Sequence, residues 1–289
     1  MTSRTRFAAL LAAIAIISAA TFLAAQGKKT TPDPALMTIA RTGSVLHTPM
    51  VASVFWGSEW ADAGFAGDIV DGLAAFFAGY SGSSYAGTAT EYYDRAGSIT
   101  RNINYTGHVF DSSAAPAPGT LTPSVTVAEV CRQTGNQPNP NAVYFVFTSS
   151  QHGTGACAFH AWGTCGSGKN AVPVQVAGVP YATGVPGTGC DALQDTETGH
   201  SLALAQIVNI AAHELVEALT DPRGTGWKDG DGEEISDKCM RIFPSTFAGF
   251  PVLSNGSVWK LQGQWSNEAY LAGTGAPNDA GQRGCVFAR

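Results

Sequence analysis

Residues 201–219 form the segment that most limits how this chain can fold. Apolar side chains recur along it at steps of three and four residues, which is the spacing of one face of an α-helix. The helix is expected to end at Asp221, because the residue before a proline is pushed out of the helical region. A helix this apolar has to be buried, so the remaining chain must supply a core that covers it.

Three ionisable residues, His213, Glu214 and Glu217, interrupt the apolar pattern of this helix. Burying them is costly in free energy unless they are hydrogen-bonded, paired or bound to a metal ion. His213 and Glu217 are four residues apart, so their side chains project from the same side of the helix. Glu214 lies about 100° further around the helix axis. The three residues therefore have the layout of the zinc-protease motif His-Glu-x-x-His, with glutamate in place of the second histidine.

This layout predicts a metal site with a catalytic carboxylate beside it. In the zinc-protease motif, the first and last residues hold the metal, and the glutamate that follows the first histidine takes a proton from water. We therefore expect His213 and Glu217 to be metal ligands and Glu214 to be the general base. Glutamate is an accepted zinc ligand, although its charge weakens the effect of the metal on water. A buried hydrogen-bonded network of histidine and glutamate, without a metal, is the alternative that the motif leaves open.

The third ligand is expected from residues 229–237, the richest acidic cluster in the chain. This cluster starts 16 residues after His213 and follows a glycine-rich turn, so the chain can fold back over the helix. Glu234 and Asp237 are the preferred third ligands, and Asp221 at the helix end is the next candidate. A carboxylate that remains is expected to accept the second ring N–H of His213, as most metal-bound histidines require.

The same acidic segment also resembles part of a calcium-binding loop. It contains Asp-x-Asp-Gly, beginning at Asp229, and carboxylates are ligands that calcium prefers. The EF-hand pattern is incomplete, because the twelfth residue counted from Asp229 is Met240 rather than glutamate. Zinc is therefore the expected cofactor, and a structural calcium ion is the alternative.

Two further histidines and a pair of serines give weaker signals. His152 and His160 lie near Cys157, and either could face the metal site, although a lone histidine near a strand is more often structural. Ser149 and Ser150 precede His152, but the chain has no Gly-x-Ser-x-Gly motif. A serine hydrolase is therefore not supported.

The N-terminus predicts export. Two arginines precede residues 7–25, an apolar run without a charged residue that ends in small side chains. This is the layout of a secretory signal peptide over residues 1–25. We expect a polar linker over residues 26–44 and one secreted globular domain over residues 45–289, free of the membrane after cleavage. An uncleaved membrane anchor is the alternative, because a run of this length can just span a bilayer.

Six cysteines follow this segment, and their even number predicts three disulfides formed in an oxidising compartment. The chain has no Cys-x-x-Cys pair, so neither a thiolate zinc site nor a thioredoxin-like site is supported. The sequence does not determine the pairing. Cys157 with Cys165 is the most local choice, and Cys239 with Cys285 would fasten the C-terminal segment.

The remaining pattern predicts a mixed α/β fold, in which the long buried helix packs on a central sheet. Residues 142–148 are apolar on both faces, which indicates a strand in the middle of a sheet. Abundant glycine (34) and proline (15) indicate a loop-rich domain, which the disulfides would stabilise. Helices are also expected at residues 66–77 and 125–132, and strands at residues 51–56, 100–110, 157–162, 172–181 and 257–261.

The composition narrows the classes of partner. Hydrophobic residues make up 44% of the chain, which is enough for a core and argues against disorder. The net charge of −6 and the lack of a basic cluster argue against a nucleic-acid partner. We expect a monomer.

Six segments occur in a fixed order along residues 45–289: VFWGSEW, SSYAGTATEYYD, VYFVFTSS, CAFHAW, NIAAHELVEALTDP and GEEISDKC. As a set, they resemble the bacterial branch of the EXORDIUM / phosphate-induced protein 1 family. The resemblance implies a secreted protein. Plant relatives are apoplastic or cell-wall proteins linked to growth and to phosphate or carbon status, without an established biochemical activity.

The plant helix resembles residues 209–222 in ending with Thr-x-Pro, but it lacks the His-Glu-x-x-Glu residues. The fold of the family therefore does not require them, which supports a metal role for these residues in this chain. Two functions from different classes are expected. One is a zinc-dependent hydrolase, most like a peptidase, that acts on an extracellular polypeptide. The other is a non-catalytic extracellular protein that binds cell-wall polysaccharide or a peptide, with a structural metal or none.

Overall fold

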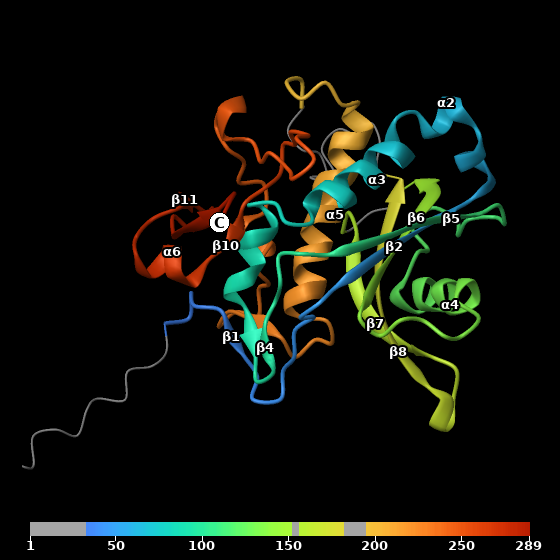
Figure 1. The fold of residues 1–289 in the computed structure, drawn as a ribbon, viewed down its shortest axis with the longest axis horizontal. Coiled ribbons are helices and arrows are strands. Elements are labelled where there is room, and N and C mark those ends of the chain that lie inside the picture. Colours follow the sequence, from blue (N-terminus) through green and yellow to red (C-terminus); the bar gives the residue numbers. More distant parts are fainter. Residues whose placement is uncertain (1–32, 152–155, 182–194) are drawn as a thin grey trace, which may run out of the picture. The chain divides into compact units, whose positions relative to one another are not determined.

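A five-stranded mixed sheet forms the centre of the fold (Figure 1). The computed structural model describes residues 33–151, 156–181 and 195–289. The expected signal peptide and the first part of the linker lie outside them. The folded unit is Pro34–Arg289, so it begins earlier than the boundary at residue 45 that the sequence indicates.

The sheet has the strand order β5-β2-β6-β8-β7. Its first four strands in this order run parallel, and β7 pairs antiparallel with β8 at the edge. The prediction of a mixed fold around a central sheet is confirmed. The strands are β2 (Met50–Trp56), β5 (Asn104–Asp111), β6 (Ala142–Gln151), β7 (Phe159–Cys165) and β8 (Val172–Tyr181).

Strand β6 lies in the middle of this sheet, as its run of apolar residues predicts. Successive side chains of a strand point to opposite faces of the sheet. Phe145 and Phe147 belong to one core cluster, whereas Val146 belongs to a second cluster on the other face. Both faces of β6 are therefore buried, which explains why the strand has no polar face.

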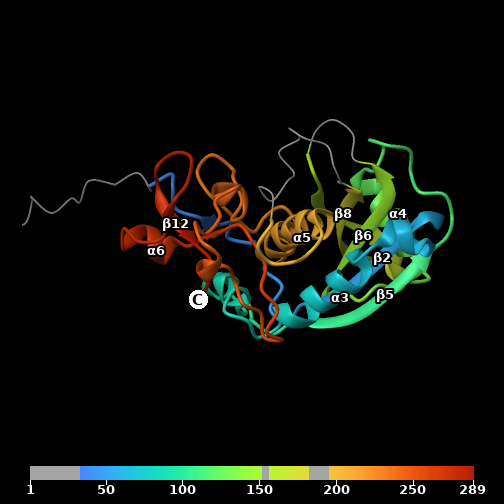
Figure 2. The same ribbon diagram turned by 90° about the horizontal axis from the view of Figure 1, so that it is seen from above.

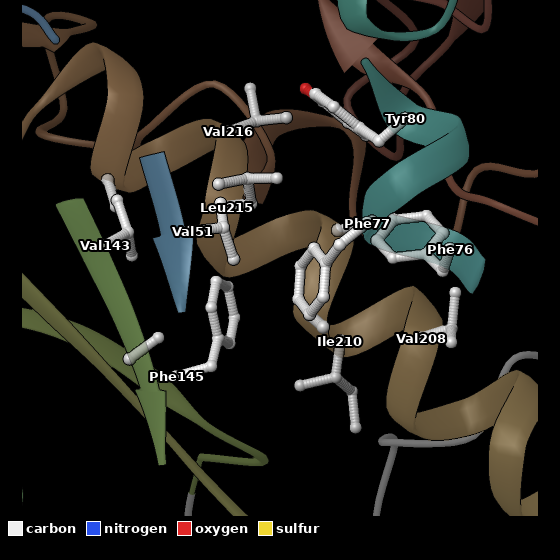
Figure 3. Close-up of a cluster of buried hydrophobic side chains, with 14 of the residues drawn as sticks. Val51, Phe76, Phe77, Tyr80, Val143, Phe145, Val208, Ile210, Leu215 and Val216 are labelled. Atoms are coloured by element: carbon white, nitrogen blue, oxygen red, sulfur yellow. The ribbon is translucent and has the colours of Figure 1, made fainter. Parts of the chain in front are cut away.

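Helices cover both faces of the sheet (Figure 2). Helices α3 (Ile69–Tyr80) and α5 (Leu202–Thr220) pack against one face and against each other, and α4 (Pro123–Gln133) covers the other face. Apolar side chains from α3, α5, β2 and β6 converge in the larger core (Figure 3). Helix α5 is long and apolar enough to cross a membrane by length and composition, but most of it is buried inside the protein.

Local chemistry sets the ends of α5. The Ser201 side chain accepts a hydrogen bond from the Leu204 N–H at 3.1 Å, which caps the start of the helix. At the other end, the Asp221 N–H donates to the Glu217 carbonyl, and Pro222 then stops the helix as predicted. The helix therefore ends just beyond the residues of the candidate site.

Shorter elements complete the fold. They are β1 (Thr38–Ile39) paired with β9 (Trp227–Lys228), β3 (Tyr93–Asp94) paired with β4 (Gly97–Ser98), a small sheet of β10 (Gln264–Trp265), β12 (Arg283–Val286) and β11 (Ala276–Pro277), the helices α2 (Ala63–Ala66) and α6 (Asn267–Leu271), and several short 3-10 helices. One 3-10 turn, Asp237–Cys239, matters for the site. Much of the C-terminal half is loop, as the glycine and proline content predicts.

Two predicted elements differ from the structure. The helix expected from residue 66 begins at Ile69, because Gly67 has a positive φ of 53° and separates α2 from α3. The strand expected at residues 257–261 is not a strand, since only an isolated bridge joins Val258 to Val252. Loop hydrogen bonds take up the backbone there instead.

The disulfides confirm one proposed pairing and correct the other. Cys239 is bonded to Cys285, as expected. Cys165 is bonded to Cys131 rather than to Cys157, because α4 packs against β7 and brings the two sulfurs together. Cys157 is also disulfide-bonded. These bonds indicate an oxidising, extracellular type of environment.

Candidate metal centre

The acidic segment folds back onto the C-terminal half of α5, as the sequence predicts. The Ser236 hydroxyl donates to the backbone carbonyl of His213 at 3.1 Å. The backbone N–H of Asp237 donates to Glu217 Oε1 at 3.2 Å. These two bonds hold the 3-10 turn at Asp237 against the helix turn that carries His213 and Glu217.

His213, Glu217 and Asp237 place three possible ligand atoms around one point. Nε2 of His213 is 3.2 Å from Glu217 Oε1 and 3.4 Å from Asp237 Oδ1. Two ligand atoms bound about 2.0–2.1 Å from one tetrahedral zinc ion lie about 3.3 Å apart. The donor types and these two distances therefore fit one zinc ion at this point. The Asp237 side chain is 46% exposed, so this side of the group faces solvent.

The second ring nitrogen of His213 does not meet a carboxylate, which corrects the expectation from the sequence. The Gln262 amide nitrogen lies 3.1 Å from His213 Nδ1 and also donates to the Ser236 carbonyl at 2.9 Å. With the amide in this orientation Nδ1 has to accept, which requires a neutral ring with its proton on Nε2 between Glu217 and Asp237. A cation at Nε2 requires the other tautomer, with the Gln262 amide turned so that its oxygen accepts from Nδ1–H.

Glu214 is a buried carboxyl group with an unusual pKa. Burial raises the pKa of Glu214 to about 7, and the nearby Glu217 carboxylate adds to this, whereas His213 and His160 oppose it. Within residues 33–151, 156–181 and 195–289, the Glu214 side chain makes no hydrogen bond and no salt bridge. A carboxyl group with a pKa near neutrality can both take up and release a proton at physiological pH.

The other predicted ligands lie in a second group around His160. Nε2 of His160 is 2.7 Å from Glu234 Oε2 and 3.9 Å from Glu217 Oε2. Glu234 therefore faces His160 and not His213. Asp221 is fully buried at the end of α5 and belongs to neither three-residue group.

A lysine lies beside the two carboxylates of this second group. Lys228 Nζ is 3.0 Å from Glu234 Oε1 and 3.2 Å from Asp221 Oδ2. The Asp221 Oδ1 atom accepts a hydrogen bond from the Gly226 N–H at 2.6 Å, whereas Oδ2 is buried and accepts no well-formed hydrogen bond from the described residues. Burial and the neighbouring Glu234 carboxylate raise the pKa of Asp221. Lys228 therefore compensates part of the negative charge, and one carboxylate oxygen remains poorly satisfied.

His160 lies in the site because of strand register. His160 and Trp162 point to the face of β7 opposite to Ala161, which packs with α4. Pairing of His160 with Ala177 of β8 brings the imidazole beside α5. The sequence singled out His160 only as one of two lone histidines, and the other, His152, lies outside the described residues.

The ion pair of His160 predicts a pH-dependent stability in the metal-free protein. Burial alone would lower the pKa of His160, but the carboxylates of Glu234, Glu217 and Glu214 raise it from 6.5 to about 9. The stabilisation by protonated His160 is therefore complete below pH 6.5 and is lost as the pH rises through 9. We expect the melting temperature to fall across this range, and the fall to be smaller in His160→Gln.

The measurement is thermal unfolding followed by circular dichroism at several pH values. His108→Gln is a matched control, because His108 is exposed on β5. This control should keep the wild-type pH dependence. An equal fall in the wild-type protein and in His160→Gln would contradict the assignment.

A scan of the chain against protein-family models finds no match, and a search of curated proteins finds no significantly similar sequence. The resemblance to the EXORDIUM family therefore stays a prediction that rests on the sequence motifs.

Proposed function

We propose that this chain is an exported, metal-dependent hydrolase with a zinc site formed by His213, Glu217 and Asp237. One observation carries the proposal. Nε2 of His213 lies at the distances from Glu217 Oε1 and Asp237 Oδ1 that a single zinc ion needs, and the buried carboxyl group of Glu214, with a pKa of about 7, lies next to His213 on the same helix. The histidine nitrogen favours zinc over calcium, which prefers oxygen ligands.

The roles of the side chains follow from their positions. A divalent cation held there would supply Lewis acidity, which polarises a carbonyl group and acidifies water. Glu214 would accept the proton of the attacking water and deliver it to the leaving group. Asp237, the exposed member of the group, marks the side from which a substrate would enter. Hydrogen bonds from the Asp237 N–H and the Ser236 hydroxyl hold the two segments in register.

Export and the class of substrate belong to the same proposal. The apolar N-terminal segment and the disulfides support secretion. The similarity of the motif to that of zinc peptidases favours an extracellular polypeptide as substrate, and the EXORDIUM resemblance makes a bacterial cell-wall setting the natural comparison.

A non-catalytic function is the second candidate, and one observation favours it. The hydrogen bonds of Gln262 satisfy Nδ1 of His213 and the Ser236 carbonyl without a metal. In that case the ionisable residues stabilise the fold as a buried network, and the protein binds cell-wall polysaccharide or a peptide elsewhere.

Zinc binding by purified protein separates the two candidates. We expect metal-free wild-type protein to bind zinc tightly in calorimetric titration. His213→Ala and Asp237→Ala should each weaken zinc binding by more than about 100-fold. Loss of a residue that only hydrogen-bonds to a metal ligand weakens binding by up to about 100-fold, and loss of the ligand itself should cost more. His108→Ala, which removes an exposed imidazole, should bind as the wild type does. Wild-type protein that binds no zinc would overturn the proposed function.

A further inference from the structure

We propose that this centre binds two divalent cations, with the Glu217 carboxylate bridging them and with His160 and Glu234 holding the second ion. The first ion is that of the proposed function, on which this inference rests. The second group is His160, Glu217 and Glu234, whose ligand atoms lie within 4.8 Å of one another.

Glu217 lies between two histidines. Its Oε1 lies 3.2 Å from His213 Nε2, and its Oε2 lies 3.9 Å from His160 Nε2. The two oxygens of one carboxylate therefore face two different histidines, each of which has its own acidic partner. A carboxylate placed in this way can bind one ion through each oxygen, as in two-metal hydrolytic sites.

The negative charge of the cluster also favours two cations over one. Five carboxyl groups lie in it, and Lys228 is the only permanent cation that contacts them among the described residues. With neutral histidines and ionised carboxylates, the cluster has four negative charges in excess. One divalent cation leaves half of this excess next to the nearly fully buried Glu217, whereas two balance it.

The poorly satisfied oxygen of Asp221 points the same way. Asp221 is fully buried, its Oδ2 accepts no well-formed hydrogen bond from the described residues, and Lys228 contacts both Asp221 and Glu234. A second cation bound to Glu234 would neutralise that carboxylate. Lys228 could then pair with Asp221 alone. Asp221 thus gains a full counter-ion when the second ion binds.

The second ion has to replace a proton. His160 Nε2 and Glu234 Oε2 are 2.7 Å apart, a hydrogen-bond distance, and so are closer than the roughly 3.3 Å that separates two ligands of one tetrahedral ion. Binding therefore releases the shared proton to solvent and moves the two groups apart. The second ion should bind more weakly than the first, and its affinity should rise with pH.

Metal stoichiometry tests the inference. Equilibrium dialysis of metal-free wild-type protein against excess Mn²⁺ should give two ions per chain. Electron paramagnetic resonance should show coupling between them. His160→Ala and Glu234→Gln should each keep one ion and lose the coupling, whereas His108→Ala should keep two coupled ions. Circular dichroism and unfolding curves establish that the variants are folded. If His160→Ala does not fold, the conservative variant Glu234→Gln still tests the second ion.

The outcomes separate this inference from the function on which it rests. One ion per wild-type chain at saturating Mn²⁺, or two ions in folded His160→Ala, overturns the bridged pair. Tight binding of a single zinc ion together with hydrolysis then leaves the proposed function standing. Wild-type protein that binds no divalent ion overturns both.

Discussion

Glu214→Gln is expected to lower peptide hydrolysis by about 10²–10⁴-fold while zinc affinity stays at the wild-type value. The amide has nearly the same size as the carboxylate but cannot accept a proton. Glu214 belongs to neither three-residue metal group, and its side chain makes no hydrogen bond or salt bridge within the described residues, so the change removes no ligand. The measurement is kcat/KM on a fluorogenic peptide library, paired with calorimetric zinc titration of the same preparations.

Glu233→Gln is the matched control for this change. Glu233 is an exposed carboxylate on the same acidic segment, and its replacement should leave both turnover and zinc affinity unchanged. The wild-type rate should rise with pH as Glu214 loses its proton, near or below pH 7 because a bound cation favours the ionised form. Full activity in Glu214→Gln would remove the proposed base, and reduced zinc affinity would show that Glu214 is instead part of the metal site.

The parts of the site that the sequence predicts are those set by local geometry. His213, Glu214 and Glu217 share one helix, whose 3.6-residue period fixes their relative directions whatever surrounds them. The acidic segment could be anticipated because a short glycine-rich turn limits where it can lie. The histidine that each carboxylate of this segment faces could not be predicted. Glu234 faces His160 and Asp237 faces His213 because of the detailed path of the loop.

The position of His160 and the pairing of one disulfide depend on non-local structure. His160 enters the site through the order of the strands and the register of β7 on β8, neither of which is encoded within the CAFHAW segment itself. The pairing of Cys165 with Cys131 depends in the same way on the packing of α4 against β7. Helix α5 and strand β6 could be predicted from the sequence, because the pattern of each depends only on its own residues and on burial.

The Cys239–Cys285 bond connects the stability of the domain to the candidate site. Cys239 ends the 3-10 turn that begins at Asp237, and Cys285 lies in β12. The bond thus fastens the segment that carries Asp237 to the C-terminal sheet. Replacement of both cysteines by alanine should lower the free energy of unfolding by about 4 kcal/mol, because the bond closes a loop of 46 residues in the unfolded chain. It should also weaken zinc binding, since Asp237 loses its anchor.

The Cys131–Cys165 bond provides the comparison that tests this connection. It closes a loop of 34 residues, so its loss should cost nearly as much stability, but it joins α4 to β7 on the face of the sheet away from α5. Urea unfolding should therefore show similar losses for the two double-alanine variants. Calorimetry should show weaker zinc binding only when Cys239 and Cys285 are replaced. Equal zinc affinity in both variants would mean that the hydrogen bond from the Asp237 N–H to Glu217 is enough to hold the ligand in place.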